Sequence, residues 1–350
     1  MDTPKITKET KNKIHVDFEG KIPFWQRLKG KVFSMYFLQN VVWYAFRLVL
    51  MIGISYVILF PFFSKITASF MGPTDFVDAT VLMIPKAFTL DTYRYIFLEN
   101  NYIQAFFNTL LLSLSCALIQ TFICCLIGYG LAKFKFKGNK IVMFLVILTM
   151  IVPHSTIRLS MLMHFRYFDL GVIQGIQHSG VTAYKGIIEL ITGEALNLTN
   201  TFAPLIILSV CGIAFKNGLY IYMMRQFFKG VPDELEESAY VDGSGTFRTF
   251  FQIILPLSIP MMITIFLFSF SWQWTDDFYT KLFFQTSQTT LMPDIVVVPP
   301  SLETDYAGQS AYYTAIRNTC GIMIIAPLVV VYLFCQRYLI QGIERSGIVG

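Results

Sequence analysis

The sequence predicts an all-α integral membrane protein with six transmembrane helices. Among its 350 residues, 55% are hydrophobic and 14% are charged, and the mean hydropathy is +0.57. Because a soluble domain carries about 25% charged residues, this composition indicates a chain that buries much of its surface in lipid. Six apolar segments are long enough to cross a bilayer. They cover about residues 42–63, 105–132, 141–163, 202–228, 257–274 and 315–334.

The residues before the first apolar segment are basic and amphipathic. Between Lys5 and Lys31, positive charges are interleaved with aromatic residues such as Trp25. A basic, aromatic stretch beside a membrane span favours a helix lying on the cytoplasmic leaflet. A partly disordered tail is the alternative.

The third apolar segment contains Pro153, which is followed by His154 and Arg158. The four-residue spacing places His154 and Arg158 on one face of a helix. A charge inside a span is costly, so Arg158 is expected to face protein, water or the lipid headgroups. Two roles follow for Arg158: it reaches the headgroups, or it lines the solute pathway and holds an anionic group.

The basic residues predict the orientation of the chain. The short loop at residues 133–140 holds four lysines, and it lies on the same side as the basic N-terminal segment. By the positive-inside rule that side is the cytoplasm. The loop between the fourth and fifth segments and both termini then also face the cytoplasm.

That loop, residues 231–256, is acidic. A short helix from Pro232 to about Val241 ends at Gly243, which tolerates the left-handed conformation of a helix stop. Ser244 is a candidate N-cap for a second helix. The crowded acids of the first helix repel one another and would be relieved by a basic partner, so a protein contact is expected. These acids are Asp233, Glu234, Glu236 and Glu237.

The spacing in this loop resembles the EAA loop of ABC importer permeases. The matching residues are Glu237-Ser238-Ala239, Asp242-Gly243 and Ile253 to Pro256, with Ser238 in place of the first alanine of the family. The resemblance implies a coupling helix pair that docks into a groove of a cytoplasmic ATPase. The residues it assigns to coupling are Glu234, Glu237, Ala239, Asp242, Gly243, Leu255 and Pro256.

Other stretches resemble the maltose-type carbohydrate subgroup of these permeases. They are Arg225–Phe228, Trp272–Phe278 and Gln336–Gly342, while Asn108–Leu110 and Gly128–Lys133 resemble the start of the ABC type-1 transmembrane domain. The C-terminus departs from the subgroup because it lacks the usual lysine. Residues 1–43 and 178–198 lie outside the family pattern.

The resemblance implies a type I ABC importer permease fold with four regions. These are the N-terminal segment 1–43, the first helix and extracellular loop 44–104, the transmembrane domain 105–340, and the cytoplasmic tail 341–350. It also implies partners: a second permease subunit, two copies of a cytoplasmic ABC ATPase and an extracellular solute-binding protein. The expected location is the bacterial plasma membrane.

The loop before the sixth segment is stiffened by Pro293, Pro299 and Pro300. The resemblance implies that this loop contacts the extracellular binding protein. Trp272 and Trp274 fit an interfacial aromatic belt, and a sugar-stacking role is the alternative. The candidate pathway residues are therefore His154, Arg158, Trp272 and Trp274.

Several functions are disfavoured by missing motifs. The sequence has no glycine-rich phosphate loop followed by Lys-Ser/Thr, so ATP is expected on the partner ATPase and no cofactor on this chain. No metal-ligand spacing, catalytic constellation or nucleic-acid-binding pattern is found. The predicted function is the permease subunit of an ATP-driven, binding-protein-dependent carbohydrate importer. An ABC permease for a non-sugar solute, a membrane enzyme and a secondary transporter are the alternatives.

Overall fold

The computed structural model describes residues 6–9, 15–18, 35–169, 174–178, 181–285, 289–305 and 308–345. The chain divides into two compact units, Met1–Thr67 and Ala68–Gly350. In the first unit, strands β1 (Ile6–Glu9) and β2 (His15–Phe18) pair antiparallel, and the helix α2 covers Met35–Ala68. The two strands lie before Phe24, where the aromatic stretch for which a helix is expected begins. The prediction for residues 19–34 lies outside the described residues.

The second unit is nearly all helical. Strands β3 (Gln174–His178) and β4 (Val181–Lys185) form an antiparallel pair within it. Its helices follow one another along the chain as α3 (Asp91–Glu99), α4 (Tyr102–Lys133), α5 (Asn139–Ile151), α6 (Arg158–Arg166), α7 (Ile187–Thr192), α8 (Ala203–Val210), α9 (Asn217–Lys229), α10 (Glu234–Val241), α11 (Thr246–Thr249), α12 (Leu255–Trp274), α13 (Phe278–Phe283) and α14 (Gln309–Arg345).

Four helical stretches of the described chain are long and apolar enough to cross a membrane. They cover residues 39–68, 102–133, 246–274 and 309–339. The third stretch is continuous because a π-helical turn, Phe250–Ile254, joins α11 to α12. The last of the four belongs to α14, which continues to Arg345, beyond the predicted end of the sixth segment.

The other two predicted spans are each built from two short helices, so the expectation of six continuous helices is wrong at these places. α5 ends at Ile151 and α6 begins at Arg158, on either side of Pro153. Proline has no backbone N–H and disfavours helix at the residue before it, which explains this interruption. α8 ends at Val210 and α9 begins at Asn217, after Lys216 in the left-handed conformation.

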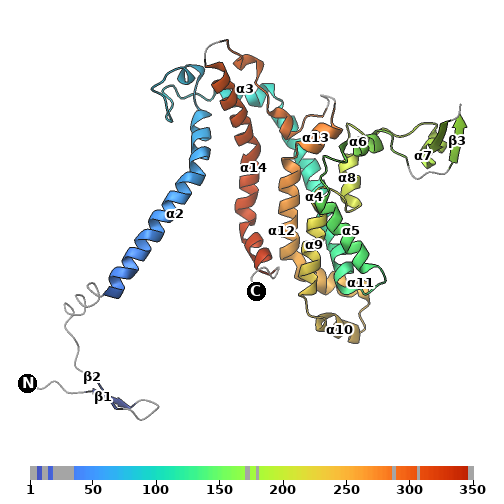
Figure 1. The fold of residues 1–350 in the computed structure, drawn as a ribbon, viewed down its shortest axis with the longest axis horizontal. Coiled ribbons are helices and arrows are strands. Elements are labelled where there is room, and N and C mark those ends of the chain that lie inside the picture. Colours follow the sequence, from blue (N-terminus) through green and yellow to red (C-terminus); the bar gives the residue numbers. More distant parts are fainter. Residues whose placement is uncertain are drawn as a thin grey trace, which may run out of the picture. The chain divides into compact units, whose positions relative to one another are not determined.

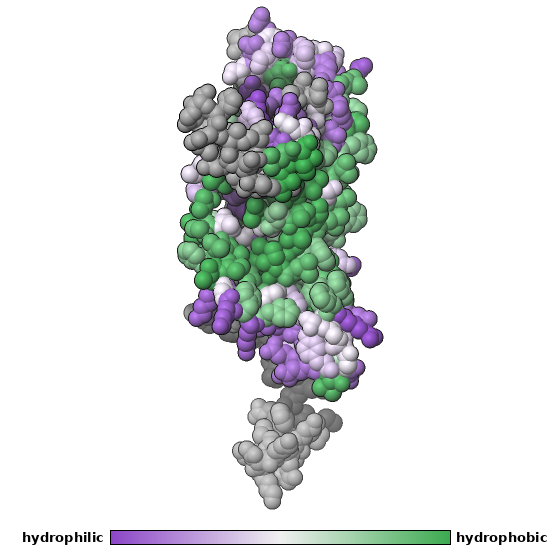
Figure 2. Space-filling view, turned by 90° about the vertical axis from the view of Figure 1, so that its right-hand side faces the viewer, coloured by the Kyte–Doolittle hydropathy of each residue, from purple (hydrophilic) through white to green (hydrophobic). Residues whose placement is uncertain are grey.

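Helix α4 forms the centre of the second unit. Helices α8, α9 and α12 pack on it, while α14 packs on α12 and α5 on α9, as Figure 1 shows. Gly128 permits a close approach of α4 to α9, because a Cβ atom there would lie 2.5 Å from Cβ of Met224 in α9. In the face shown in Figure 2, a broad apolar band separates two hydrophilic ends. We name them the α10 end and the α13 end.

Candidate functional site

At the α10 end, α10 and α11 form a short helical hairpin. Gly243 has φ +81°, and its N–H donates to the Tyr240 carbonyl at 3.0 Å, while the Ser244 N–H donates to the Ala239 carbonyl at 2.9 Å. These bonds satisfy the end of α10 in the way left-handed helix stops do, which confirms the predicted conformation of Gly243. The N-cap position of α11 is held by Gly245 and not by Ser244 as predicted.

A lysine at the end of α4 anchors this hairpin. Lys133 Nζ lies 2.7 Å from the Val231 carbonyl oxygen, 2.5 Å from Asp233 Oδ1 and 3.6 Å from Glu236 Oε2. The Tyr129 hydroxyl donates to Glu236 Oε1 at 2.6 Å. The hydrogen bond from Lys133 lowers the pKa of the Asp233 carboxyl below its usual value. Two of the four crowded acids are thus neutralised within the chain.

Sequence reasoning missed this network because its partners lie far apart along the chain. Lys133 begins the four-lysine loop that predicts the orientation of the chain, and nothing near it in the sequence indicates a contact with α10. The side chain of Lys133 is 8% exposed and that of Glu236 is 10% exposed. A largely buried ion pair with an added hydrogen bond fixes geometry, since removing one member leaves a buried charge. The network therefore ties α10 to the end of α4.

The opposite face of the hairpin is open. Glu234, Glu237 and Asp242 are exposed, and within the described part of the chain their carboxylates form no ion pair. Beside them, Val241 is 87% exposed and Phe247 is 83% exposed. Exposed apolar groups beside unpaired charges are typical of protein interaction surfaces. We call the surface made by these five residues the hairpin surface.

The remaining predicted coupling residues have other positions. Ala239 is buried on the inner side of α10. Leu255 and Pro256 begin α12, after the π-helical turn, with Leu255 partly buried and Pro256 exposed. These three residues support or flank the hairpin, and the exposed acids are the members of the predicted set that can meet a partner directly.

Nearer the α13 end, the two interrupted spans bring a cluster of aromatic residues together. His154, from the break between α5 and α6, lies 5.0 Å from the Phe215 ring and 5.8 Å from the Tyr279 ring, measured between centroids. Phe215 lies 5.5 Å from the Trp272 ring. The structure therefore brings together two predicted pathway residues, His154 and Trp272.

Lys216 completes this cluster and was not predicted. Its Nζ lies 4.8 Å from the Phe215 ring centroid and 5.0 Å from the Trp272 ring centroid. Both distances are within the range of cation–π attraction. A cavity of about 260 Å³ is lined by Pro153, His154, Phe215 and Lys216 among others. The signal for it in the sequence is a lysine inside an apolar segment whose length predicts one continuous span.

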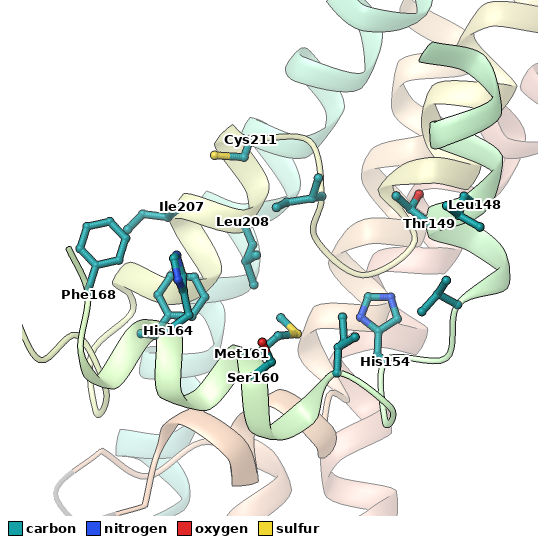
Figure 3. Close-up of a pocket in the computed structure, with 14 residues that line it drawn as sticks. Leu148, Thr149, His154, Ser160, Met161, His164, Phe168, Ile207, Leu208 and Cys211 are labelled. Atoms are coloured by element: carbon teal, nitrogen blue, oxygen red, sulfur yellow. The ribbon is translucent and has the colours of Figure 1, made fainter. Parts of the chain in front are cut away.

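A larger pocket of about 690 Å³ adjoins the cluster at His154. Figure 3 shows side chains from α5, α6 and α8 around it, with His154 close to the end of α5. Its lining is mainly apolar, with Thr149, Ser160 and His164 as the other polar members. Sugar hydroxyls need several convergent hydrogen-bonding groups, so this pocket is a poor sugar site.

Two other predicted pathway residues are placed differently. Trp274 is 1% exposed and its indole N–H donates to the Ile324 carbonyl at 2.9 Å. Its burial between α12 and α14 makes it a packing residue, so its proposed pathway role does not fit. Arg158 is exposed at the first turn of α6. It does not share a helix face with His154, because residues 152–157 are not helical.

The loop before α14 is folded into the α13 end. Met292 and Ile295 are fully buried, and the Met292 N–H donates to the Thr109 hydroxyl at 2.8 Å. Of the prolines predicted to contact a binding protein, Pro299 is buried, Pro293 is partly buried and Pro300 is exposed. Deleting this loop would remove part of the core, so its surface has to be tested by single substitutions.

Asp276 lies between α12 and α13. Its Oδ2 accepts a hydrogen bond from the Tyr279 N–H at 3.1 Å. Burial raises the pKa of its carboxyl to about 7, because the charged form loses solvation. The neighbouring Asp277 is exposed and pairs with Lys281 at 2.8 Å. In the described residues, no cluster of His, Cys, Asp and Glu is arranged to hold a metal ion.

Comparisons with known proteins identify the family. Residues 125–345 match the family described as "Binding-protein-dependent transport system inner membrane component". The polygalacturonan/rhamnogalacturonan transport system permease protein YtcP of Bacillus subtilis is 26% identical over an alignment of 298 residues, and the match covers 83% of this chain and 92% of YtcP. The arabinooligosaccharides transport system permease protein AraQ of Bacillus subtilis is 26% identical over 300 residues, covering 85% and 92%.

A solved structure shows the same fold. It is a bacterial ABC transporter involved in the import of the acidic polysaccharide alginate, with a TM-score of 0.63 at 17% identity, and the match covers 87% of this chain and 98% of that one. The family match extends over more than half of the chain. This chain therefore belongs to the family of inner membrane components of binding-protein-dependent transport systems, as a multi-pass transport protein of the bacterial plasma membrane with the type I ABC importer permease fold.

Proposed function

We propose that this chain is a permease subunit of an ATP-driven importer of oligosaccharides. YtcP and AraQ, which match most of the chain, are named for polymeric or oligomeric sugars. The Trp272–Phe278 and Gln336–Gly342 stretches also resemble the carbohydrate subgroup. The chain would act with a second permease subunit, two copies of an ABC ATPase that binds ATP, and an extracellular solute-binding protein.

The observation that carries the coupling role is that the exposed hairpin surface belongs to a hairpin held to α4 by an ion pair and hydrogen bonds. Its exposed acids and apolar side chains offer a contact for an ATPase groove, while Lys133 and Tyr129 tie α10 to α4. On the other side, α11 continues through the π-helical turn into α12. A displacement of the hairpin is therefore passed to two long helices of the bundle core.

We assign the α10 end to the cytoplasm and the α13 end to the outside. Lys135, Lys137 and Lys140 lie in the short loop at the α10 end, as the positive-inside rule requires of a cytoplasmic loop. The binding protein would then meet the exposed part of the loop before α14, including Pro300 and Val297. Its buried members, such as Pro299, would hold that surface in place.

The test of this function is uptake by the complete complex in proteoliposomes, driven by ATP and dependent on the binding protein. Glu237→Lys reverses a charge on the hairpin surface and should lower both uptake and retention of the ATPase on the purified permeases. The charge reversal places a cation where the ATPase is expected to present basic groups.

The matched control is Glu194→Lys, which makes the same change at an exposed site far from α10 in the sequence. It should leave uptake and ATPase retention close to those of the wild type. Normal uptake and normal ATPase retention in Glu237→Lys would contradict the coupling role. ATP-driven uptake of a non-sugar solute alone would contradict the oligosaccharide assignment.

A further inference from the structure

Lys216 has an unusual position for a positively charged residue. It lies at the end of the break between α8 and α9, inside a largely apolar segment. Its φ of +68° is in the left-handed region, which residues other than glycine and asparagine rarely adopt. A charge at membrane depth is costly and normally marks a pathway or a binding function. The backbone conformation and the charge are thus both unfavourable at this position without a compensating interaction.

The aromatic rings compensate only part of this cost. The faces of Phe215 and Trp272 attract the ammonium group at 4.8 and 5.0 Å. An ammonium has three N–H donors, and among the described residues Lys216 has no carboxylate partner within an ion-pair distance. The two rings hold the Lys216 ammonium group in place. They leave it able to bind an anion, which is the strongest interaction that an ammonium can form.

Space for such an anion lies beside the lysine. The cavity of about 260 Å³ reaches Lys216, and its lining includes the polar group of His154. Trp272, which holds the ammonium from the other side, is itself 50% exposed. Arg158 is exposed at the start of α6 and forms no ion pair among the described residues either. The group that enters here meets a positive charge in largely apolar surroundings, where electrostatic attraction is strong.

We propose that Lys216, held by Phe215 and Trp272, binds the carboxylate of an acidic sugar unit, so that the solutes carried by this permease are acidic oligosaccharides. This inference rests on the proposed import of oligosaccharides. A lysine suits this task because it recognises a carboxylate as a point charge and does not impose the fixed fork geometry of arginine. A moving substrate can therefore be held and released without a strict orientation.

The experiment compares two forms of one sugar in proteoliposomes holding the complete complex. The probes are trigalacturonate and its fully methyl-esterified form, which has the same sugar backbone without the negative charges. Uptake is measured against the concentration of substrate-loaded binding protein. Wild-type complex should take up trigalacturonate and should discriminate against the neutral ester.

Lys216→Asn removes the charge, and asparagine tolerates the left-handed backbone, so no new strain is introduced. It should raise the concentration for half-maximal uptake of trigalacturonate about tenfold, the effect of losing one charged hydrogen bond. Uptake of the ester should not change. Lys216→Arg, which keeps the charge, should retain the preference for the acid. Lys86→Asn, at an exposed lysine paired with Asp78, is the matched control and should behave as wild type.

Four results would overturn the inference. Equal loss of both probes in Lys216→Asn would mean that Lys216 serves the assembly, for example by pairing with a carboxylate of the second permease. Equal uptake of both probes by the wild type would show that no charge is recognised, and this readout does not depend on any variant. Uptake of neutral oligosaccharides alone would refute acidic recognition while leaving the proposed function intact, whereas uptake of no sugar would refute both.

Discussion

At the scale of single residues, the fold holds a carboxyl group whose charge opposes stability. In the folded protein, burial raises the pKa of the Asp276 carboxyl from its ordinary range to about 7. A raised pKa means that the group contributes stability below its unfolded value and that this contribution is lost as the pH rises through the folded value. The free energy of unfolding should therefore fall between about pH 4 and pH 7, by at most about 1.4 kcal/mol per pH unit. The melting temperature of the purified protein should fall over the same range.

Asp276→Asn tests this assignment. Asparagine keeps an oxygen that can accept the Tyr279 N–H but carries no charge, so the variant should lose less stability than the wild type between pH 5 and pH 8. Asp277→Asn changes the adjacent, exposed carboxyl and should preserve the fall of the wild type. A melting temperature of Asp276→Asn that still declines with pH as steeply as in the wild type would exclude Asp276 as the titrating group.

Other residue positions show what one sequence can and cannot predict. The left-handed stop at Gly243 was predicted because glycine, a polar helix before it and an apolar run after it are local signals. The pairing of Lys133 with Glu236 joins positions about a hundred residues apart, and no local pattern reports such a contact. Trp274 was misjudged for the same reason, since its burial depends on α14, which follows much later in the chain.

At the scale of elements, the close approach of α4 and α9 sets the position of the hairpin. α9 leads directly into α10, so a shift of α9 also moves the hairpin surface. Gly128→Ala would place a Cβ atom 2.5 Å from Cβ of Met224 and 3.0 Å from the Arg225 backbone nitrogen. Overpacking of this kind costs about 1–3 kcal/mol. The variant should show a lower melting temperature and weaker ATP-driven uptake.

The same helix offers a matched control. At Gly130 a Cβ atom would meet nothing within 4 Å. Gly130→Ala should therefore be neutral or slightly stabilising, because alanine favours a helix by up to about 1 kcal/mol over glycine. If both alanine variants melted alike, close packing at Gly128 would not be the feature that positions α9.

Four of the six predicted spans match long apolar helices, because length and hydropathy suffice to find them. The breaks were predicted poorly. Pro153 is a signal for the first break, although the length of the apolar segment predicts one continuous helix there. The second has no proline, and its signal was the polar group Lys216-Asn217-Gly218. Local polarity inside an apolar run marks an interruption only when surrounding helices satisfy the freed backbone groups, which is a property of the assembled bundle.

At the scale of the whole molecule, the structure combines a hairpin that is tied to α4, the exposed hairpin surface and the lysine–aromatic cluster of Lys216, Phe215 and Trp272. The hairpin surface lies at the α10 end, tied to α4 and continuous with α12. The lysine–aromatic cluster includes Trp272 near the far end of α12. Helix α12 therefore joins the hairpin to the cluster, and under the proposed function it would be the physical link between ATPase contact and solute handling.

The most direct test of this account is a site-specific cross-link in the assembled complex. A photo-reactive phenylalanine analogue is placed at Val241, which is 87% exposed on the hairpin surface, or at Leu82, which is also 87% exposed in the loop between α2 and α3. After illumination, the cross-linked partner is identified by mass spectrometry. The account predicts that position 241 links to the ATPase and that position 82 does not. Absence of the ATPase from the products of position 241, in a complex that still hydrolyses ATP, would contradict it.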